Sequence, residues 1–403
     1  MKNNTLYLFT ATFPFGKAES FLETEILFLS DKFEKIVIIP LSGQTQKIRN
    51  VPKNCIVEKP IITSRRIQYF KGLFFPLTLS IFIGYFFRNR IYSNNRKLKT
   101  WIIGYVMANN LLSSKTIKSV FKDIKSNDVC YFYWGKGSNI LSYFYRGKAI
   151  FVSRFHGEWD LWEESSGGCV PLRTDVAKSL DKVVFISKKG ESYFKERYPY
   201  AETCVFPLGS KDYGLQLEKL NDNVVRVVSC STVYPLKRVP LIFEALNSMT
   251  DIKIEWTHLG GGSHFQELKE IVEKETKSHL SVNLVGMVSH DEVMNYYKEH
   301  HFDLFINMST SEGVPVSIME AMSFGIPILA TDVGSTAEEV PKQVGELLSP
   351  NPSIEEIIAK IRLILSSNYS PRKFWNENYN ADKNYSEFAN MLYNLSNNAK
   401  LSI

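Results

Sequence analysis

The chain has 403 residues, of which 44% are hydrophobic and 22% charged, a composition typical of a globular protein with room for two domains and unlike that of a disordered chain. The formal net charge is only +6, and the clearest basic cluster flanks an apolar run, so a nucleic-acid-binding protein is not indicated. Five scattered cysteines without C-x-x-C spacing argue against a disulfide framework or a zinc site and favour a reducing compartment.

The first half of the chain predicts strands and helices in alternation. Residues 6–9 form an apolar run too short for the core of a signal peptide, and they are typical of a first buried strand. A helix is expected over 20–30. Further strands are expected at 36–40, 129–133, 150–153 and 183–186.

An apolar run interrupts this half at residues 73–87, LFFPLTLSIFIGYFF. Basic residues surround it: Arg65, Arg66 and Lys71 before it, and Arg88, Arg90, Arg96, Lys97 and Lys99 after it. The run is too short to span a bilayer, whereas an apolar helix with basic flanks suits the headgroup region of an anionic leaflet. A buried helix pair of the first domain is the alternative. We expect residues 65–99 to be a membrane-associating segment.

The second half gives a clearer pattern of strands and helices. Strands are predicted at 224–228, 252–259, 282–285, 303–307 and 326–330, and helices at 241–249, 265–277, 291–298 and 316–324. This alternation predicts a parallel sheet covered on both faces.

The whole pattern predicts two doubly wound α/β domains in tandem. The expected division is an N-terminal domain over 1–205, a linker over 206–223, and a C-terminal domain over 224–370. Residues 371–403 have a helical pattern, and we expect this tail to pack back on the N-terminal domain.

The most informative segment is NMSTSEGVPVSIMEAMSFGIPILATDVGSTAEEV, residues 307–340. Pro315 suits the first position of a helix, so the backbone N–H groups of Val316 and Ser317 form an anion site at a positive helix end. Glu312 and Glu320 lie close to the same helix end. Carboxylates would repel a diphosphate bound there, so we expect them to bind sugar hydroxyls on either side of it.

The Glu312-x7-Glu320 spacing, together with the thirty or so residues around it, resembles the retaining glycosyltransferases of family 4. The resemblance implies a GT-B fold, in which two Rossmann-like domains face each other across a cleft. It also implies that Glu312 contacts the donor sugar and Glu320 the ribose of the nucleotide. The alternative is a solvated helix start with two ordinary glutamates.

A second segment, SCSTVYPLKRV (229–239), follows the first strand of the second domain. Without a metal, the charge on a departing diphosphate needs fixed cations. The family usually has Arg and Lys here. This chain keeps Lys237, has Thr232 at the Arg position, and offers Arg238 as a replacement. Both cations could instead belong to a surface helix start. The chain has no D-x-D motif, and we expect neither a metal nor another cofactor.

Two loops of the second domain complete the predicted donor site. Gly261, in LGGG after a strand, allows close approach of the backbone to a ligand, although a plain turn fits equally well. Met287 lies in VGMV, which resembles the family segment whose backbone faces the base. Glu338 fits the family pattern only loosely and also suits an ordinary helix start.

Residues of the first half contribute the predicted acceptor side. ATFPFGKAESFLETE (11–25) resembles the family's first loop, with Gly16 between strand and helix. His156 follows a strand, at a position that often lies beside the acceptor and the transferred sugar in the family. An ordinary loop histidine is the alternative. Trp134 and Lys136 also follow a strand, with no role assigned.

The sequence therefore predicts retaining transfer of a sugar from a nucleoside diphosphate sugar, with a UDP-sugar favoured by family frequency and with no protein nucleophile. The resemblance and the apolar segment imply a lipid-linked or glycan acceptor, assembly of lipopolysaccharide or capsule, and a cytoplasmic protein peripheral on the inner face of the cell membrane. A sugar-nucleotide 2-epimerase and a non-catalytic binding protein are the alternatives. A dinucleotide oxidoreductase would require G-x-G-x-x-G after the first strand, which is absent.

Overall fold

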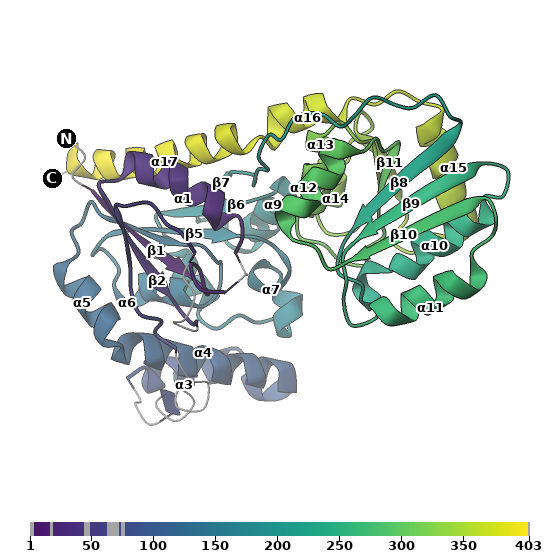
Figure 1. Cartoon of the computed structure of the whole chain (residues 1–403). Coiled ribbons are helices and arrows are strands. Elements are labelled where there is room, and N and C mark those ends of the chain that lie inside the picture. Colours follow the sequence, from purple (N-terminus) through teal and green to yellow (C-terminus); the bar gives the residue numbers. More distant parts are fainter. Residues whose placement is uncertain (1–3, 17–18, 44–48, 63–71, 74–76, 402–403) are drawn as a thin grey trace. The chain divides into compact units, whose positions relative to one another are not determined.

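The computed structural model describes residues 4–16, 19–43, 49–62, 72–73 and 77–401. The chain folds as two compact units, one built from Met1–Leu208 with Lys383–Ile403 and one from Gly209–Asp382. We call them unit 1 and unit 2. Each contains a single parallel sheet with helices on both faces, as the alternating pattern predicts (Figure 1).

Unit 1 contains a seven-stranded sheet in the order β3-β2-β1-β4-β5-β6-β7, with every pairing parallel. The five strands expected from the sequence are present, and β3 and β7 are additional edge strands. The strands are β1 (Thr5–Thr10), β2 (Lys35–Pro40), β3 (Cys55–Val57), β4 (Val129–Phe132), β5 (Ile150–Phe155), β6 (Lys182–Phe185) and β7 (Thr203–Val205). The strand order reverses between β1 and β4, which makes the loops after these strands the expected place for a ligand.

The helices of unit 1 enclose two cores, one on each face of the sheet. One face is covered by α1 (Leu22–Lys32) and α17 (Ala381–Leu401), which run side by side (Figure 1). The other elements are α3 (Leu79–Arg88), α4 (Asn95–Ser113), α5 (Lys115–Asp123), α6 (Leu141–Phe144), α7 (Glu158–Leu161), α8 (Arg173–Ala177), α9 (Lys188–Arg197) and 3₁₀ turns at Ile91–Ser93, Ser138–Ile140 and Glu163–Ser166.

A buried ion pair anchors α17 to unit 1. The Nη1 atom of Arg154 lies 2.7 Å from Oε2 of Glu25 on α1, and both side chains are fully buried. The Arg154 guanidinium stacks 4.7 Å from the ring centroid of Phe388 on α17. The tail expected as one segment, 371–403, is divided, because α16 (Pro371–Asn378) belongs to unit 2 and only the chain from Lys383 onward belongs to unit 1.

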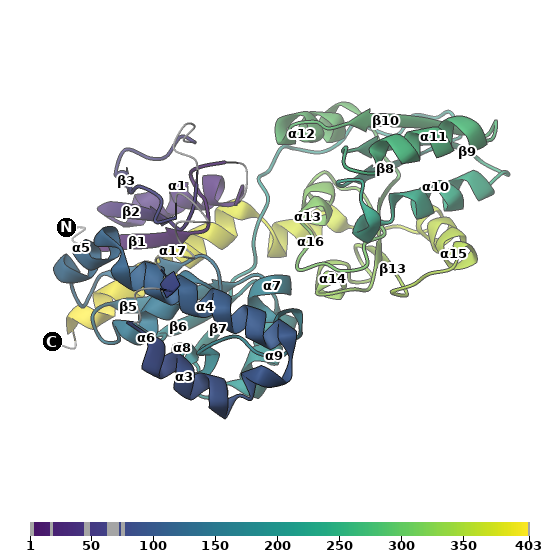
Figure 2. The same ribbon diagram turned by 90° about the horizontal axis from the view of Figure 1, so that it is seen from below.

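The apolar run of unit 1 forms a helix that is buried on one side only. Within the expected segment 65–99, residues 65–71 and 74–76 lie outside the described residues. Phe82 on α3 is fully buried, with its ring 5.9 Å from that of Trp101 and 5.4 Å from that of Tyr105 on α4. Figure 2 shows α3 lying against α4 on the outside of the unit. The opposite side of α3 is exposed, so this helix has a packed face and an open face.

Unit 2 contains a six-stranded parallel sheet in the order β10-β9-β8-β11-β12-β13. Its strands are β8 (Val224–Cys230), β9 (Lys253–Leu259), β10 (Leu280–Gly286), β11 (Leu304–Asn307), β12 (Ile328–Thr331) and β13 (Gly345–Leu348). Helices α10 (Val239–Ser248), α11 (Phe265–Glu275) and α15 (Ile354–Leu365) pack in one core. The other helices are α12 (His290–Glu299), α13 (Val316–Ser323) and α14 (Thr336–Glu339), with a 3₁₀ turn at Pro235–Lys237.

The segment expected to be a linker, 206–223, is divided between the units at Leu208. Its larger part runs along unit 2. The backbone N–H of Gln216 donates to the carbonyl of Phe324 at 3.3 Å, and Asp212 pairs with Arg372 at 2.6 Å. The chain therefore passes from unit 1 to unit 2 at Leu208 and Gly209, and the rest of the expected linker belongs to unit 2.

Candidate active site

In unit 2, the loops after β8 and β11 meet at the point where the strand order reverses. The chain passes from β8 to β9 and β10 on one side of the sheet, and β11, β12 and β13 lie on the other. The N–H of Thr310 donates to the carbonyl of Leu236 at 2.8 Å, which ties the two loops together. Ligands of doubly wound sheets bind at this place.

An ion pair joins these loops. The Lys237 ammonium lies 2.5 Å from Oε1 of Glu312, and the side-chain amide of Asn307 donates to the same oxygen at 3.3 Å. The two charged side chains are 20% and 11% exposed. The structure thus brings together two residues predicted from separate motifs. Asn307, the last residue of β11, is an additional contributor that the sequence analysis did not single out.

The loop after β12 packs closely against the backbone of Glu312 and Gly313. Gly334 has a φ of +57°, and a Cβ there would lie 1.7 Å from the carbonyl oxygen of Glu312. The N–H of Ser335 donates to the carbonyl of Gly313 at 3.2 Å. Only glycine fits at position 334 without displacing the Glu312 backbone.

A second carboxyl group lies near Glu312 in the core of unit 2. Glu339, the last residue of α14, is fully buried, and neither side-chain oxygen has a hydrogen-bond partner among the described residues. Burial raises the pKa of Glu339 well above its usual range, and the charges of Glu312 and Glu338 act in the same direction. The sequence indicated Glu338 as the weak candidate, and only the fold shows that its neighbour is the buried one.

The helix α13 begins at Val316, so Pro315 is its N-cap, one position before the first helical position predicted for it. Val316 and Ser317 are half-buried in the first turn. Its first N–H groups have no partner within the helix and give its end a partial positive charge. Glu320, on the next turn, accepts a hydrogen bond from Nε2 of His290 at 2.7 Å.

His290, the first residue of α12, was not singled out from the sequence, because 30 residues separate it from its partner. The hydrogen bond to Glu320 raises the pKa of His290 above its ordinary value, against the lowering effect of burial. The hydrogen bond to the Glu320 carboxylate thus favours the protonated form of His290.

Arg238, predicted as a second phosphate-binding cation, is held by backbone carbonyl groups, and its role at the phosphate stays a prediction. Arg238 has a left-handed backbone, and its guanidinium donates to the carbonyl oxygens of Met308 (2.6 Å), Ser309 (3.1 Å) and Pro350 (2.9 Å). These bonds tie the loops after β11 and β13 to the start of α10. Lys237 is therefore the one cation of this segment that is directed at Glu312.

The predicted glycine and base-facing loops lie against each other. A Cβ on Gly261 would lie 3.1 Å from the backbone nitrogen of Met287, and the N–H of Gly260 donates to the carbonyl of Gly286 at 3.0 Å. The Met287 side chain is 74% exposed. The N–H of Val233 donates to the carbonyl of Gly261 at 2.8 Å, so the loops after β8, β9 and β10 form one continuous edge.

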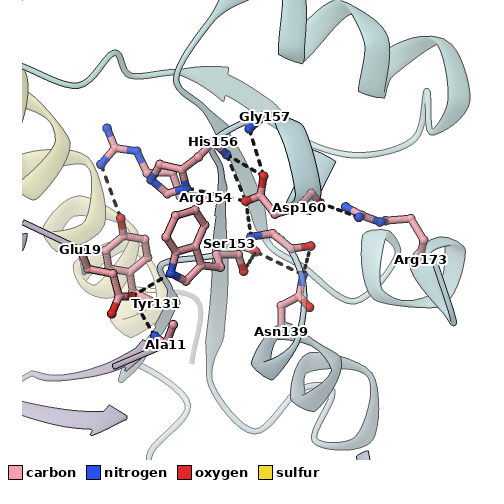
Figure 3. Close-up of polar contacts among 12 residues, drawn as sticks. Ala11, Glu19, Tyr131, Asn139, Ser153, Arg154, His156, Gly157, Asp160 and Arg173 are labelled. Atoms are coloured by element: carbon pink, nitrogen blue, oxygen red, sulfur yellow. Dashed lines mark hydrogen bonds and ion pairs between the residues drawn. The ribbon is translucent and has the colours of Figure 1, made fainter. Parts of the chain in front are cut away.

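In unit 1, Glu19 holds the first loop in shape. Its carboxylate accepts hydrogen bonds from the N–H groups of Ala11 (2.8 Å), Thr12 (2.7 Å) and Phe13 (2.7 Å). The indole N–H of Trp134 donates to the same carboxylate at 2.8 Å. Gly16, with a φ of +71°, is exposed between this loop and α1. Trp134, to which the sequence analysis assigned no role, thus helps to hold the Glu19 carboxylate, which Figure 3 shows beside Ala11.

His156 lies at the end of β5, in an aromatic setting. Its ring lies 4.6 Å from that of Tyr133 and 4.5 Å from that of Trp134. The Asp160 carboxylate accepts hydrogen bonds from the backbone N–H groups of His156 and Gly157, and Figure 3 shows it beneath both. Neither ring nitrogen of His156 has a hydrogen-bond partner among the described residues, although Nδ1 lies 3.7 Å from Asp160. The ring is thus packed between aromatic side chains, with both nitrogens buried.

Comparisons with known proteins agree with this arrangement. Residues 210–381, nearly all of unit 2, match the family model described as glycosyl transferases group 1. The O-antigen biosynthesis glycosyltransferase WbnH of Escherichia coli is 38% identical over 80 residues, which span 20% of this chain and 21% of that protein. The match thus covers about a fifth of that curated relative.

Two solved structures resemble the whole chain. The lipopolysaccharide outer core galactosyltransferase WaaB in its apo form has a TM-score of 0.66 at 15% identity, covering 99% of both chains. Anabaena Alr3699/HepE in complex with UDP has a TM-score of 0.63 at 14% identity, covering 96% of this chain and 99% of that one. The predicted GT-B fold is confirmed, and the family match over unit 2 supports a transferase of the glycosyl transferases group 1 type.

Proposed function

We propose that the protein transfers a sugar from a nucleoside diphosphate sugar to a lipid-linked or glycan acceptor, with retention at the anomeric carbon, as in family 4. The observation that carries the proposal is the Lys237–Glu312 pair beside the start of α13, at the switch point of the sheet in the matched domain. A cation, a helix N-terminus and a carboxylate at one place suit a donor with a charged diphosphate and a neutral sugar.

In this proposal, the donor diphosphate lies at the N–H groups of Val316 and Ser317 and accepts hydrogen bonds from the Lys237 ammonium. Glu312 then exchanges part of its contact with Lys237 for the hydroxyls of the donor sugar. Glu320 binds the ribose hydroxyls, while the backbone at Gly261 and Met287 lies along the nucleotide. No divalent metal is required, because fixed positive groups carry the charge of the leaving diphosphate.

Retention follows if the acceptor hydroxyl attacks the face from which the diphosphate leaves. The bond from the anomeric carbon to the diphosphate oxygen breaks, the bond to the acceptor oxygen forms, and a diphosphate oxygen takes the acceptor proton. In this proposal His156 belongs to the acceptor side, where a ring nitrogen that has no hydrogen-bond partner among the described residues would bond a sugar hydroxyl. No protein nucleophile is needed in this path.

UDP is the favoured nucleotide, supported by the UDP complex of the structurally similar HepE. Assembly of a surface polysaccharide of the lipopolysaccharide type is supported by the names of WbnH and WaaB, and capsule assembly is the other proposed role. The sugar and the linkage depend on pocket contacts that distinguish members of a shared fold.

The acceptor is proposed to lie at an anionic membrane surface, which the open face of α3 would meet. Leu79, Ile83 and Phe87 recur every four residues and are 40%, 43% and 66% exposed. The chain from Lys59 to Lys122 contains no Asp or Glu. An apolar stripe in a basic surround suits peripheral binding at the inner face of the cell membrane. None of the described helices is both long and apolar enough to cross a bilayer.

The first test is ligand-dependent thermal stabilisation with UDP, GDP, ADP and CMP and their sugars. Selective binding to the native state adds about 2.7 kcal/mol at a hundredfold excess over Kd. We expect a shift with one nucleoside diphosphate, UDP in the first place, that is lost in Lys237→Ala. Lys269→Ala, an exposed lysine on α11 of the same unit, is the matched control and should keep the shift.

A flat panel for a folded protein would overturn the donor-site proposal and favour a non-catalytic protein. With a donor identified, NMR of the product anomer tests retention, and an inverted product would contradict it. A 2-epimerase would instead convert the nucleotide sugar without any acceptor.

A further inference from the structure

Two cations of unit 1, the half-buried Lys136 and the buried Arg173, are not used by the transfer proposed above. Lys136 follows β4, and its ammonium donates to the hydroxyl of Ser166 at 2.6 Å. Arg173, the first residue of α8, is 3% exposed. Its Nη2 donates to the backbone carbonyl of Asp160 at 2.6 Å, as Figure 3 shows, but its Nε and Nη1 have no hydrogen-bond partner among the described residues.

Neither cation has a carboxylate partner within ion-pair distance among the described residues, although two acidic side chains are near. The Asp160 carboxylate is taken up by the backbone N–H groups of Gly135, His156 and Gly157, at 3.0–3.2 Å. The Glu163 carboxylate accepts the hydroxyl of Tyr198. The guanidinium of Arg173 lies 4.9 Å from the ring centroid of Phe155. Buried donors without acceptors are rare in folded proteins and call for an explanation, which a ligand can supply.

The two cations are close enough to disfavour each other. Burial, and after it the positive charge of Arg173, lowers the pKa of Lys136 below its ordinary value. Burial also lowers the pKa of Arg173. A bound anion would relieve both effects, because it supplies the missing opposite charge and the missing acceptors.

Asp160 links the loops that carry Lys136 and His156, and its backbone carbonyl accepts a hydrogen bond from Arg173. Asp160 binds the N–H of Gly135, the residue before Lys136, and also the N–H of His156. The loops after β4 and β5 are thus tied to one point. Through Asp160, the backbone next to Lys136, the Arg173 guanidinium and the His156 backbone are linked to one another.

We infer that Lys136 and Arg173 form a subsite for a phosphate group of the acceptor. The inference rests on the proposed function and narrows its acceptor to a phosphorylated one. An arginine fork and a lysine point charge together match a phosphate, which carries up to two charges and several acceptor oxygens. A neutral sugar would leave the buried Arg173 and the half-buried Lys136 without an opposite charge.

The surroundings of the subsite favour a lipid-borne phosphate. The 3₁₀ turn that carries Ser166 contacts α4, where the hydroxyl of Thr100 donates to the Ser166 carbonyl at 3.3 Å. Tyr85, on α3, donates to the carbonyl of Val170 at 3.1 Å. The segment from Ser166 to Arg173, which carries part of the subsite, therefore contacts α3, the helix with the exposed apolar stripe. A phosphate attached to a lipid could occupy the subsite while its chain remains at that surface.

Calorimetric titration of the full chain tests the subsite, with inorganic phosphate, glucose 1-phosphate, a water-soluble short-chain prenyl phosphate and octyl glucoside as probes. We expect the prenyl phosphate to bind and Lys136→Gln to weaken that binding at least tenfold. Lys148→Gln, an exposed lysine of the same unit, should have no effect. Arg173→Lys is a second variant that keeps the charge and removes the fork, and we expect an intermediate loss.

Tighter binding of glucose 1-phosphate than of the prenyl phosphate would support the phosphate subsite and assign it to a soluble phosphate ester. Equal affinity of Lys136→Gln and wild type for every phosphate probe would overturn the inference, as would binding of octyl glucoside as tight as that of the prenyl phosphate. UDP stabilisation should be unchanged in Lys136→Gln. Phosphate binding without any nucleotide binding would overturn the proposed function and support the subsite. Nucleotide binding without any phosphate binding would support the proposed function and overturn the subsite.

Discussion

The two units differ in whether the charged side chains of their candidate sites already have partners. In unit 2, each of the two predicted glutamates already has a side-chain partner: Glu312 pairs with Lys237, and Glu320 accepts a hydrogen bond from His290. In unit 1, Lys136 and Arg173 have no carboxylate within ion-pair distance among the described residues, and the one central carboxylate, Asp160, binds backbone N–H groups. The two glutamates of unit 2 thus have partners before a ligand arrives, whereas Lys136 and Arg173 of unit 1 have no carboxylate partner in the described part of the chain.

This difference suggests how each unit meets its ligand. To bind a ligand in unit 2, the charged side chains have to replace their present contacts with contacts to the hydroxyls and phosphates of the ligand. Binding there should therefore depend on how easily those contacts break. A ligand of unit 1 would add the charge that is missing. Substitutions should therefore act mainly on selectivity and rate in unit 2, and on stability and anion binding in unit 1.

The largest effect is expected at the buried pair of unit 1, because nothing replaces it. Glu25→Gln leaves the Arg154 guanidinium buried without its partner, and breaking such a pair costs about 3–5 kcal/mol. Urea unfolding followed by hydrogen exchange in β4 and β5 should show the loss in unit 1. Glu346→Gln breaks the half-exposed pair with Lys360 in unit 2, and we expect a loss of about 1 kcal/mol or less there. Equal losses in the two variants would refute the contrast.

The next largest effect is expected in catalysis. Glu312→Gln keeps the shape of the side chain and removes its charge, so the hydrogen bonds to Lys237 and to the donor sugar weaken. A hydrogen bond to a charged group contributes about 1.5–3 kcal/mol, and we expect kcat/KM for transfer to fall about 10-fold to 150-fold. Glu346→Gln serves again as the control and should retain activity. Full activity in Glu312→Gln would remove this residue from the donor site.

A smaller effect is expected for binding to vesicles, where the two units again differ. Phe87→Ser on α3 should lower the partition coefficient on phosphatidylglycerol vesicles about tenfold, on the order of 1.5 kcal/mol for an apolar side chain returned to water. Leu220→Ser is the matched control, since Leu220 is 57% exposed in unit 2 and outside the basic region. Cosedimentation measures both. An equal decrease in the two variants would show that α3 is not the binding face.

Much of the fold could be predicted from the sequence, because buried parallel strands read as apolar runs at a regular pitch. β9 and α13 match their expected ranges within two residues. The missed strands have a physical reason in common, since β3, β7 and β13 lie at sheet edges, with only three or four residues each and one paired neighbour. Short edge strands carry little hydrophobic pattern. The path of residues 209–223 along unit 2 depends on contacts such as Asp212 with Arg372, far apart in sequence.

The site divides along the same line. Glu312, Glu320 and Lys237 could be predicted because they lie in contiguous motifs with fixed spacing, although their roles still rest on the resemblance. The burial of Glu339, the pairing of His290 and the sequestration of Arg238 arise from contacts between distant segments, which spacing does not encode. In unit 1, Asp160 organises three backbone N–H groups on two loops, and that too becomes visible only in the fold.

The smallest effect, and the most direct test of compensation in unit 2, concerns the protonation of His290. The hydrogen bond to Glu320 raises the pKa of His290, with Asp291 acting in the same direction and Lys211 against it. The resulting stability is fully present below the ordinary histidine pKa of about 6.5 and is lost as the pH rises through the raised value.

NMR titration of the imidazole should show the raised pKa of His290 in the free protein and a decrease toward the ordinary value in Glu320→Gln. If Glu320 binds ribose hydroxyls, a bound nucleotide takes over part of the carboxylate, so the pKa of His290 should also fall when UDP saturates the wild type. A pKa that falls in the variant but not with UDP would keep the ion pair and remove Glu320 from the nucleotide site. The Glu320–His290 pair would then stabilise unit 2 without taking part in nucleotide binding.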